Sequence, residues 1–159
     1  MVLLNKDEIK ELIPHREPFL LIDEIVALDP GKTCTAVKYI TEDDFWFSGH
    51  FPGYPVTPGV LMVEMLAQTG GVCIASVPEH KGKLGLFAKI EHAKFRRQVI
   101  PGDKLELTVE VRKIRSSVAV CTAEAHVGKE KAVTASLTFA FAPRDPKQMN
   151  IAEASDAAE

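Results

Sequence analysis

The chain has 159 residues and a formal net charge of −3, from 19 lysines and arginines against 22 aspartates and glutamates. This length predicts one domain with a substantial core, and a hydrophobic share of 46% with 26% charged residues excludes wholesale disorder. The near-neutral balance argues against a nucleic-acid binder, which usually carries a strongly basic face.

A short amphipathic helix is expected first. Asn5 and Glu8 stand at capping-box spacing, and apolar residues follow at helical intervals, which predicts a helix as far as Leu12, before Pro14. No basic region precedes an apolar one at this terminus, so a signal peptide is not expected. Periodicity and turn residues then predict three segments: a strand over 19–28, a strand over 33–39 and an irregular loop over 41–58.

A second helix is expected over residues 59–77. Apolar residues occupy every face of this segment, as in a fully buried helix. Thr57 is the expected N-cap, with Pro58 at the first helical position, where its missing N–H costs nothing. Prolines and glycines open the uncharged run that contains this helix, so a membrane span is not expected.

Strands are expected throughout the C-terminal half. Apolar and polar residues alternate with a period of two, which indicates antiparallel strands with one buried face. The expected strands cover residues 84–91, 105–111, 121–127 and 133–141. One apolar helix and one antiparallel sheet predict a single two-layer α+β domain over residues 1–143, with the sheet curled around the helix. Residues 144–159 are expected to form a flexible tail because they are polar, small and acidic.

Glu64 is the only acidic or basic side chain in the expected buried helix. Gln68 follows one turn later on the same face, where it can support the carboxyl group. Desolvating a carboxylate costs several kcal/mol, so two arrangements are open. Glu64 either pairs with an arginine or lysine from elsewhere in the chain, or lies at a cavity, where it could act as a general acid.

His50 lies in a loop whose glycines and prolines favour a single shape. An imidazole there can serve as a base at physiological pH, although an exposed loop histidine is the plainer alternative. Gly59 opens the expected helix, where free N–H groups favour a developing oxyanion, or it is simply a turn residue. The other histidines give weaker signals, and His15 is expected to have a structural role.

Lys94, Arg96 and Arg97 form the densest basic group in an otherwise acidic chain. Such a group is either a solvated face or a contact for an acidic partner. The sequence contains neither a phosphate-binding glycine loop nor a metal-ligand spacing. Its three cysteines lack C-x-x-C spacing and lie in apolar alternation, as buried structural residues do.

Four blocks of sequence together carry a family resemblance. They are residues 12–23 (LIPHREPFLLID), 49–61 (GHFPGYPVTPGVL), 64–68 (EMLAQ), and 93–97 (AKFRR) with 101–103 (PGD). In order and spacing, the chain from about residue 8 to 142 resembles the bacterial 3-hydroxyacyl-acyl-carrier-protein dehydratases. These are the β-hydroxyacyl dehydratase branch of the hot-dog fold. The resemblance implies an α+β hot-dog fold, in which an antiparallel sheet wraps around one long buried helix.

The resemblance also implies roles for particular residues. The family's catalytic dyad matches His50 and Glu64, in a site built across a dimer interface. The family's glycine that binds the thioester carbonyl through its N–H matches Gly59. Glutamate at the acid position points to the dehydratase branch, since the dehydratase–isomerase branch has aspartate there. The family often gates its acyl tunnel with a tyrosine where this chain has Leu86, which leaves Phe87 as the nearest candidate for the gate.

The implied reaction is dehydration of a (3R)-3-hydroxyacyl-[acyl-carrier-protein] to the trans-2-enoyl product in type II fatty-acid synthesis. The implied partners are an acyl carrier protein and further copies of the chain, as a homodimer assembled into a trimer of dimers. The carrier protein of this family's pathway is acidic, so the basic group of Lys94, Arg96 and Arg97 is its expected contact, with Lys94 or Arg96 near the tunnel mouth and Arg97 alternatively paired inside the dimer. No metal or organic cofactor is expected, because the thioester itself acidifies C2. The protein is expected to be cytoplasmic. Two alternatives stay open: a hot-dog acyl thioesterase, and a non-catalytic acyl-thioester-binding protein.

Overall fold

The computed structural model of the chain describes residues 1–142, 151, 155 and 156. Its helices are α1 (Lys6–Lys10), the 3₁₀ helix η1 (Phe45–Ser48), α2 (Gly59–Ala75) and the 3₁₀ helix η2 (Pro78–His80). Its strands are β1 (Glu24–Asp29), β2 (Thr33–Tyr39), β3 (Leu84–Phe95), β4 (Lys104–Ile114), β5 (Val118–Val127) and β6 (Glu130–Ala142). The tail expected over 144–159 lies outside the described residues except at 151, 155 and 156.

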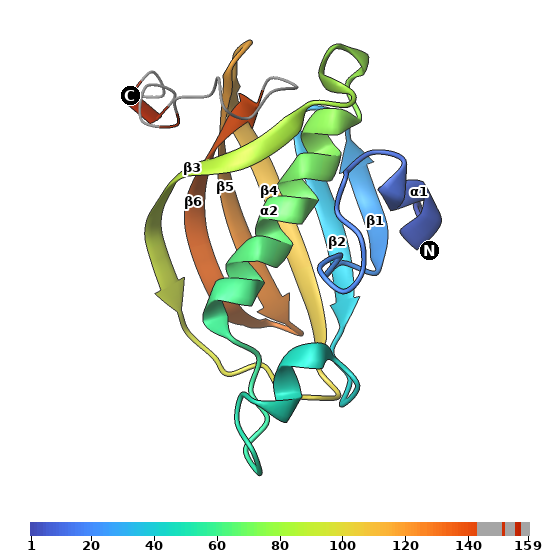
Figure 1. Cartoon of the computed structure of the whole chain (residues 1–159), viewed down its shortest axis with the longest axis vertical. Coiled ribbons are helices and arrows are strands. Elements are labelled where there is room, and N and C mark those ends of the chain that lie inside the picture. Colours follow the sequence, from blue (N-terminus) through green and yellow to red (C-terminus); the bar gives the residue numbers. More distant parts are fainter. Residues whose placement is uncertain (143–150, 152–154, 157–159) are drawn as a thin grey trace.

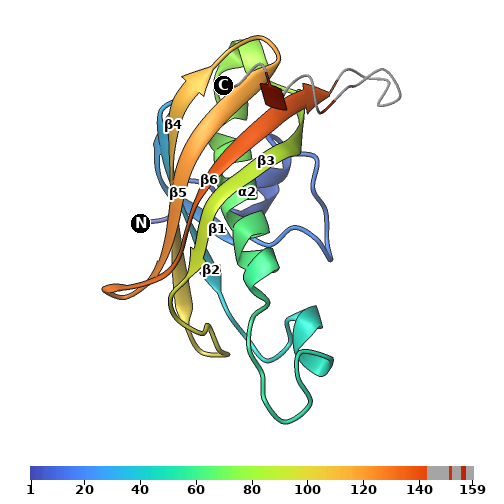
Figure 2. The same ribbon diagram turned by 90° about the vertical axis from the view of Figure 1, so that its left-hand side faces the viewer.

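The six strands form one antiparallel sheet in the order β1-β2-β4-β5-β6-β3. The long helix α2 lies along one face of this curved sheet (Figures 1 and 2). On β4, the fully buried Leu105, Leu107 and Val109 alternate with residues that face away from the helix, because side chains on a strand point to opposite faces. The expected α+β hot-dog fold is therefore confirmed.

Most of α2 is buried against the sheet. Met65, Leu66 and Val72 have no exposed surface. Gly70 allows a close approach to the sheet, because a Cβ atom there would lie 3.3 Å from the ring of Phe139. The expectation of a fully buried helix is wrong at the first turn, where Val60 is 75% exposed. An apolar side chain so exposed is a place where another surface can pack.

The strand expected over 19–28 begins only at Glu24. Leu20, Leu21 and Ile22 are buried but lie outside the strand. The Leu21 N–H donates to the side-chain oxygen of Gln68 on α2 at 2.8 Å, not to a neighbouring strand. The apolar run at residues 20–22 therefore predicts burial correctly, but its prediction of a strand there is wrong.

Thr57 does not cap α2, contrary to expectation. Pro58 occupies the N-cap position, and no side chain bonds to the free N–H groups of the first turn. The Thr57 N–H instead donates to the carbonyl oxygen of Val99 at 2.8 Å, which ties the loop to the segment after β3. The capping box of α1 is present as expected, although that helix ends at Lys10 rather than Leu12.

The three cysteines are free and buried in the core, as expected from their apolar alternation. Burial raises the pKa of each thiol, to about 11 for Cys73 and about 12 for Cys121, with the pKa of Cys34 raised in the same direction. A thiol held this far from ionisation is a poor nucleophile, so these residues belong to the core and not to a reactive site.

Candidate active site

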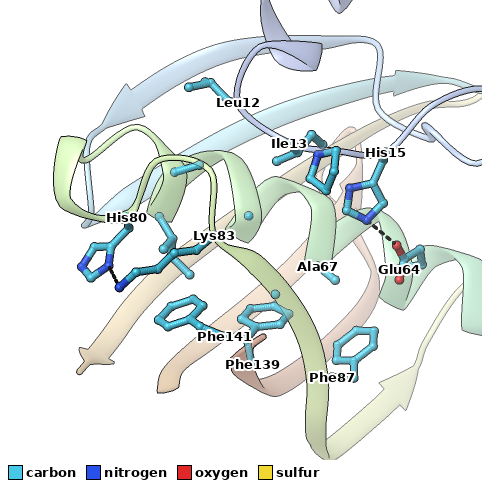
Figure 3. Close-up of a pocket in the computed structure, with 15 residues that line it drawn as sticks. Leu12, Ile13, His15, Glu64, Ala67, His80, Lys83, Phe87, Phe139 and Phe141 are labelled. Carbon is cyan, nitrogen blue, oxygen red and sulfur yellow. Dashed lines mark hydrogen bonds and ion pairs between the residues drawn. The ribbon is translucent and has the colours of Figure 1, made fainter. Parts of the chain in front are cut away.

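Glu64 lies at one end of an apolar slot beside α2 (Figure 3). The helix contributes Glu64, Ala67 and Gly71, whose spacing places them on one face. The slot has a volume of about 70 Å³, which is room for several water molecules or a short run of methylene groups. A single acidic group at the end of an apolar slot is an arrangement that can bind an acyl chain and act on one of its polar atoms.

The carboxyl group of Glu64 accepts a hydrogen bond from Gln68 and lies within ion-pair distance of His15. Its Oε1 atom lies 3.1 Å from Nε2 of Gln68 and 3.4 Å from Nε2 of His15. No lysine or arginine among the described residues forms an ion pair with it, so the first alternative finds no support in this part of the chain. The side chain is 18% exposed, which places it at the cavity that the second alternative requires.

Gln68 is fully buried and uses its whole amide group. Its oxygen accepts from the N–H of Leu21 at 2.8 Å, and its Nε2 donates to the carbonyl oxygen of Phe19 at 2.8 Å as well as to Glu64. These partners fix which end of the amide faces Glu64, because the backbone N–H needs an acceptor and the carbonyl needs a donor. The expectation that Gln68 supports the acid agrees with this geometry.

His15 reaches Glu64 from the segment between α1 and β1, a contact that neither periodicity nor spacing predicts. Arg16 holds this segment in shape, because its guanidinium donates to the carbonyl oxygens of Lys10, Ile13 and His15 at 2.7–3.0 Å. The contact with Glu64 was missed because the two residues are distant in sequence. The one signal available was that both lie in motifs that resemble the same family.

The rest of the slot is aromatic and ends in a basic pair. Phe87 and Phe139 stack with ring centroids 5.6 Å apart, and Phe141 continues the wall (Figure 3). At the far end Lys83 contacts Nδ1 of His80 at 3.0 Å and lies over the Phe141 ring. Phe87 thus lines the slot, as a gate would. Leu86, the other residue named for the gate, is not among the lining residues, because neighbouring residues on β3 face opposite ways.

His50 is held in its loop by the backbone. Its Nδ1 lies 2.7 Å from the carbonyl oxygen of Val56, so Nδ1 carries the proton and Nε2 has a free lone pair. The ring also stacks on Phe51 at 4.0 Å between centroids. The loop extends beyond the N-terminal end of α2 (Figure 1), and within the described chain neither a hydrogen bond nor an ion pair joins His50 to Glu64.

Gly59 is the first residue of α2 and opens on a separate hollow. Thr57, Phe95 and Arg96 line this hollow with it. A Cβ atom at Gly59 would lie only 2.7 Å from the Phe95 ring, so glycine is needed for this close approach. The first N–H groups of a helix have no intrahelical partner, and the positive end of the helix dipole favours a negatively charged oxygen there.

The basic group divides into two parts. Arg97 is bound within its own chain, to Asp103 at 2.8 Å and Glu130 at 3.1 Å, and these partners raise the pKa of its guanidinium group. Lys94 and Arg96 are exposed. Arg96 lies at the hollow next to Gly59, which leaves these two residues as the better candidates for contact with an acidic partner.

Residues 1–142, 151, 155 and 156 contain no group of three or more His, Cys, Asp or Glu side chains arranged to hold a metal ion. No helix in the same part of the chain is long and apolar enough to cross a membrane.

Residues 13–136 match the model of the FabA-like domain family. Among curated proteins, the chain is 47% identical over 138 residues to the 3-hydroxyacyl-[acyl-carrier-protein] dehydratase FabZ of Pelotomaculum thermopropionicum, covering 87% of this chain and 99% of that one. It is 50% identical to the FabZ of Clostridioides difficile, covering 87% and 98% of the two chains. The chain belongs to the FabA-like family, and within it to the 3-hydroxyacyl-[acyl-carrier-protein] dehydratases that the sequence motifs resemble.

Solved structures share the fold at low identity. The dehydratase heterocomplex ApeI:P from Xenorhabdus doucetiae matches with a TM-score of 0.76 at 15% identity, covering 86% of this chain and 91% of that one. A hypothetical thioesterase with coenzyme A from Streptococcus pneumoniae matches with a TM-score of 0.58 at 13% identity, covering 74% and 84%. At these identities the likeness concerns the fold alone, which hosts several activities.

Proposed function

We propose that this protein removes water from (3R)-3-hydroxyacyl-[acyl-carrier-protein] and gives the trans-2-enoyl thioester of fatty-acid synthesis. The observation that carries the proposal is Glu64, a single acid at the end of an apolar slot. Membership of a dehydratase family supports the same reaction. The acyl chain would lie along the slot, with its C3 hydroxyl group next to the carboxyl group.

In the proposed chemistry His50 acts as the base and Glu64 as the acid. Nε2 of His50 takes a proton from C2, while the N–H of Gly59 stabilises the enolate-like thioester oxygen. Glu64 gives its proton to the C3 hydroxyl group, the C3–O bond breaks, and water leaves as the C2=C3 bond forms. The proton gained by His50 and the one lost by Glu64 are then exchanged with solvent. The thioester supplies the acidity of C2, so the scheme needs no added cofactor.

Two chains would have to build each site. No hydrogen bond or ion pair joins His50 to Glu64 within the described chain, and among the described strands β3 is an edge strand that carries the exposed apolar residues Ile90 and Phe95. An exposed strand edge of this kind can pair with another chain. We therefore propose a homodimer in which His50 faces Glu64 of the partner subunit, assembled further as a trimer of dimers.

The acyl carrier protein would approach the hollow between Gly59 and Phe95. Arg96 lines this hollow and Lys94 is exposed two residues before it in the chain, whereas Arg97, which also lines the hollow, is paired with Asp103 and Glu130 of its own chain. A local positive patch on a chain of net charge −3 would steer an acidic partner to this place.

Crotonyl thioester hydration tests the reaction, because adding water removes the enoyl absorbance and leaves the thioester band. The wild type should hydrate the substrate, and His50→Ala and Glu64→Ala should each lower turnover at least about a hundredfold. Glu79→Ala, a change at an exposed acid in η2, is the matched control and should keep wild-type turnover. Loss of the thioester band would instead indicate a thioesterase.

Mixing the two inactive variants tests the shared site. In a randomly mixed dimer population, about a quarter of the sites would regain both wild-type residues, if each site uses two chains. Unfolding and refolding His50→Ala and Glu64→Ala together should therefore restore activity that neither variant has alone. If the mixture forms dimers but stays as inactive as either variant, then either each site takes His50 and Glu64 from the same chain, or one of these residues has no part in the reaction.

A further inference from the structure

We infer that His15 is a positioning residue that, together with Gln68, keeps the catalytic proton of Glu64 on Oε2. This inference rests on the proposed role of Glu64 as the acid. It concerns which of the two carboxyl oxygens delivers the proton, and what fixes that choice.

Both neighbours of the carboxyl group contact the same oxygen. Nε2 of Gln68 and Nε2 of His15 lie 3.1 and 3.4 Å from Oε1 of Glu64, while Oε2 has no hydrogen-bond partner among the described residues. The amide of Gln68 cannot turn round, because its oxygen is bound by the N–H of Leu21 and its nitrogen by the carbonyl of Phe19. Oε1 is therefore always faced by a donor.

The ring of His15 has one tautomer that suits its surroundings. Nε2 faces a carboxyl oxygen, so it carries the hydrogen. Nδ1 is buried and has no partner in the described part of the chain. A hydrogen on Nδ1 would be a buried donor without an acceptor, which is costly, so the neutral ring donates from Nε2 to Glu64.

Two donors on Oε1 leave only Oε2 for the proton of the acid. A proton on Oε1 would meet two N–H groups, whereas a proton on Oε2 faces no donor among the described residues. When Oε2 gives its proton to the leaving hydroxyl group, the negative charge that remains on the carboxylate is stabilised by the N–H groups of Gln68 and His15 that face Oε1. These contacts strengthen as charge develops, so they act on the transition state more than on bound substrate.

Arg16 holds the segment that carries His15 in shape. Arg16 donates to three carbonyl oxygens of the turn around it, including that of His15 at 2.7 Å, and the ring lies at the end of the slot next to Glu64 (Figure 3). The chain thus positions a donor on Glu64 from outside α2, and α2 provides the second donor one turn away.

Two substitutions at His15 test the inference. His15→Leu removes the donor, and His15→Gln restores an N–H at nearly the same distance along the side chain. We expect His15→Leu to lower kcat for crotonyl-pantetheine hydration about tenfold or more, with KM changed less than about threefold, because the lost bond acts mainly in the transition state. His15→Gln should recover most of that loss. Urea unfolding of both variants separates this effect from a loss of folded protein.

A measurement independent of activity follows the tautomer directly. ¹⁵N NMR of the labelled imidazole should find the hydrogen of His15 on Nε2, and Glu64→Ala should shift that signal. A hydrogen on Nδ1 would overturn the inference, as would wild-type kcat in folded His15→Leu, or equal losses in His15→Leu and His15→Gln. If Glu64→Ala keeps full activity while the NMR result holds, the proposed acid is wrong and the contact between the two side chains stands.

Discussion

Replacing Gln68 by leucine should destabilise the protein strongly, because one buried amide holds a whole segment in place. The amide is fully buried, and it satisfies the N–H of Leu21 and the carbonyl oxygen of Phe19. Leucine fills a similar space but leaves both backbone groups without a partner. Segment 19–21 would then lose its only side-chain hydrogen bonds to α2 among those described.

The size of the effect follows from the two orphaned groups. A buried donor or acceptor left without a partner costs about 1–3 kcal/mol. Because the bond to the Phe19 carbonyl is only partly buried, that group should cost about 1 kcal/mol and the pair about 2–4 kcal/mol of unfolding free energy. That is a large share of the roughly 5–15 kcal/mol that holds a typical domain together. In a chain of this length the loss corresponds to a fall in Tm of about 5–15 °C.

Urea unfolding at fixed protein concentration measures the effect, since any assembly of chains would otherwise shift the midpoint. Thr69→Val is the matched control. Thr69 is also fully buried on α2, but its hydroxyl only donates to the carbonyl of Met65 in its own helix, at 2.9 Å. Its loss should cost about 1 kcal/mol or less. If Gln68→Leu were no less stable than Thr69→Val, the amide would not be what holds segment 19–21.

Three further predictions follow from the hollow, the basic group and the core. Gly59→Ala should lower turnover about tenfold, because its Cβ would lie 2.7 Å from the Phe95 ring. Adding Phe95→Ala should restore most of the lost turnover, and a double variant as slow as Gly59→Ala would show that the clash is not the cause. Reversing the charge of Lys94 and Arg96 should raise KM for acyl-carrier substrates about tenfold at low salt and leave acyl-pantetheine kinetics unchanged, whereas equal losses on both would indicate a structural role. Burial raises the pKa of Cys73 from 9.0 to about 11, so its contribution to stability is fully present below pH 9 and is lost as the pH rises towards 11. Urea midpoints at pH 8 and 10.5 should therefore differ more in the wild type than in Cys73→Ala.

The sequence alone determined the elements whose signals are local. The period-two alternation over 105–111 and 133–141 marked strands that the structure extends by a few residues, and the capping box of Asn5 and Glu8 marked the start of α1. Side-chain direction on a strand and the needs of a helix terminus depend on neighbours in the chain, so they can be read without a fold. Glu64 stood out for the same reason, as one charge in an apolar helix.

Only the tertiary structure decided how distant residues meet. It placed His15 and Gln68 on one oxygen of Glu64, bonded His50 to the carbonyl oxygen of Val56 rather than to that carboxyl group, and bound Arg97 internally. It also bound the backbone of Phe19 and Leu21 to Gln68 of α2 rather than to a neighbouring strand, although the apolar pattern of this segment fits both. Apolar periodicity reports that a side chain is buried, but which surface buries it depends on how segments far apart in the chain pack together, and that information is not local.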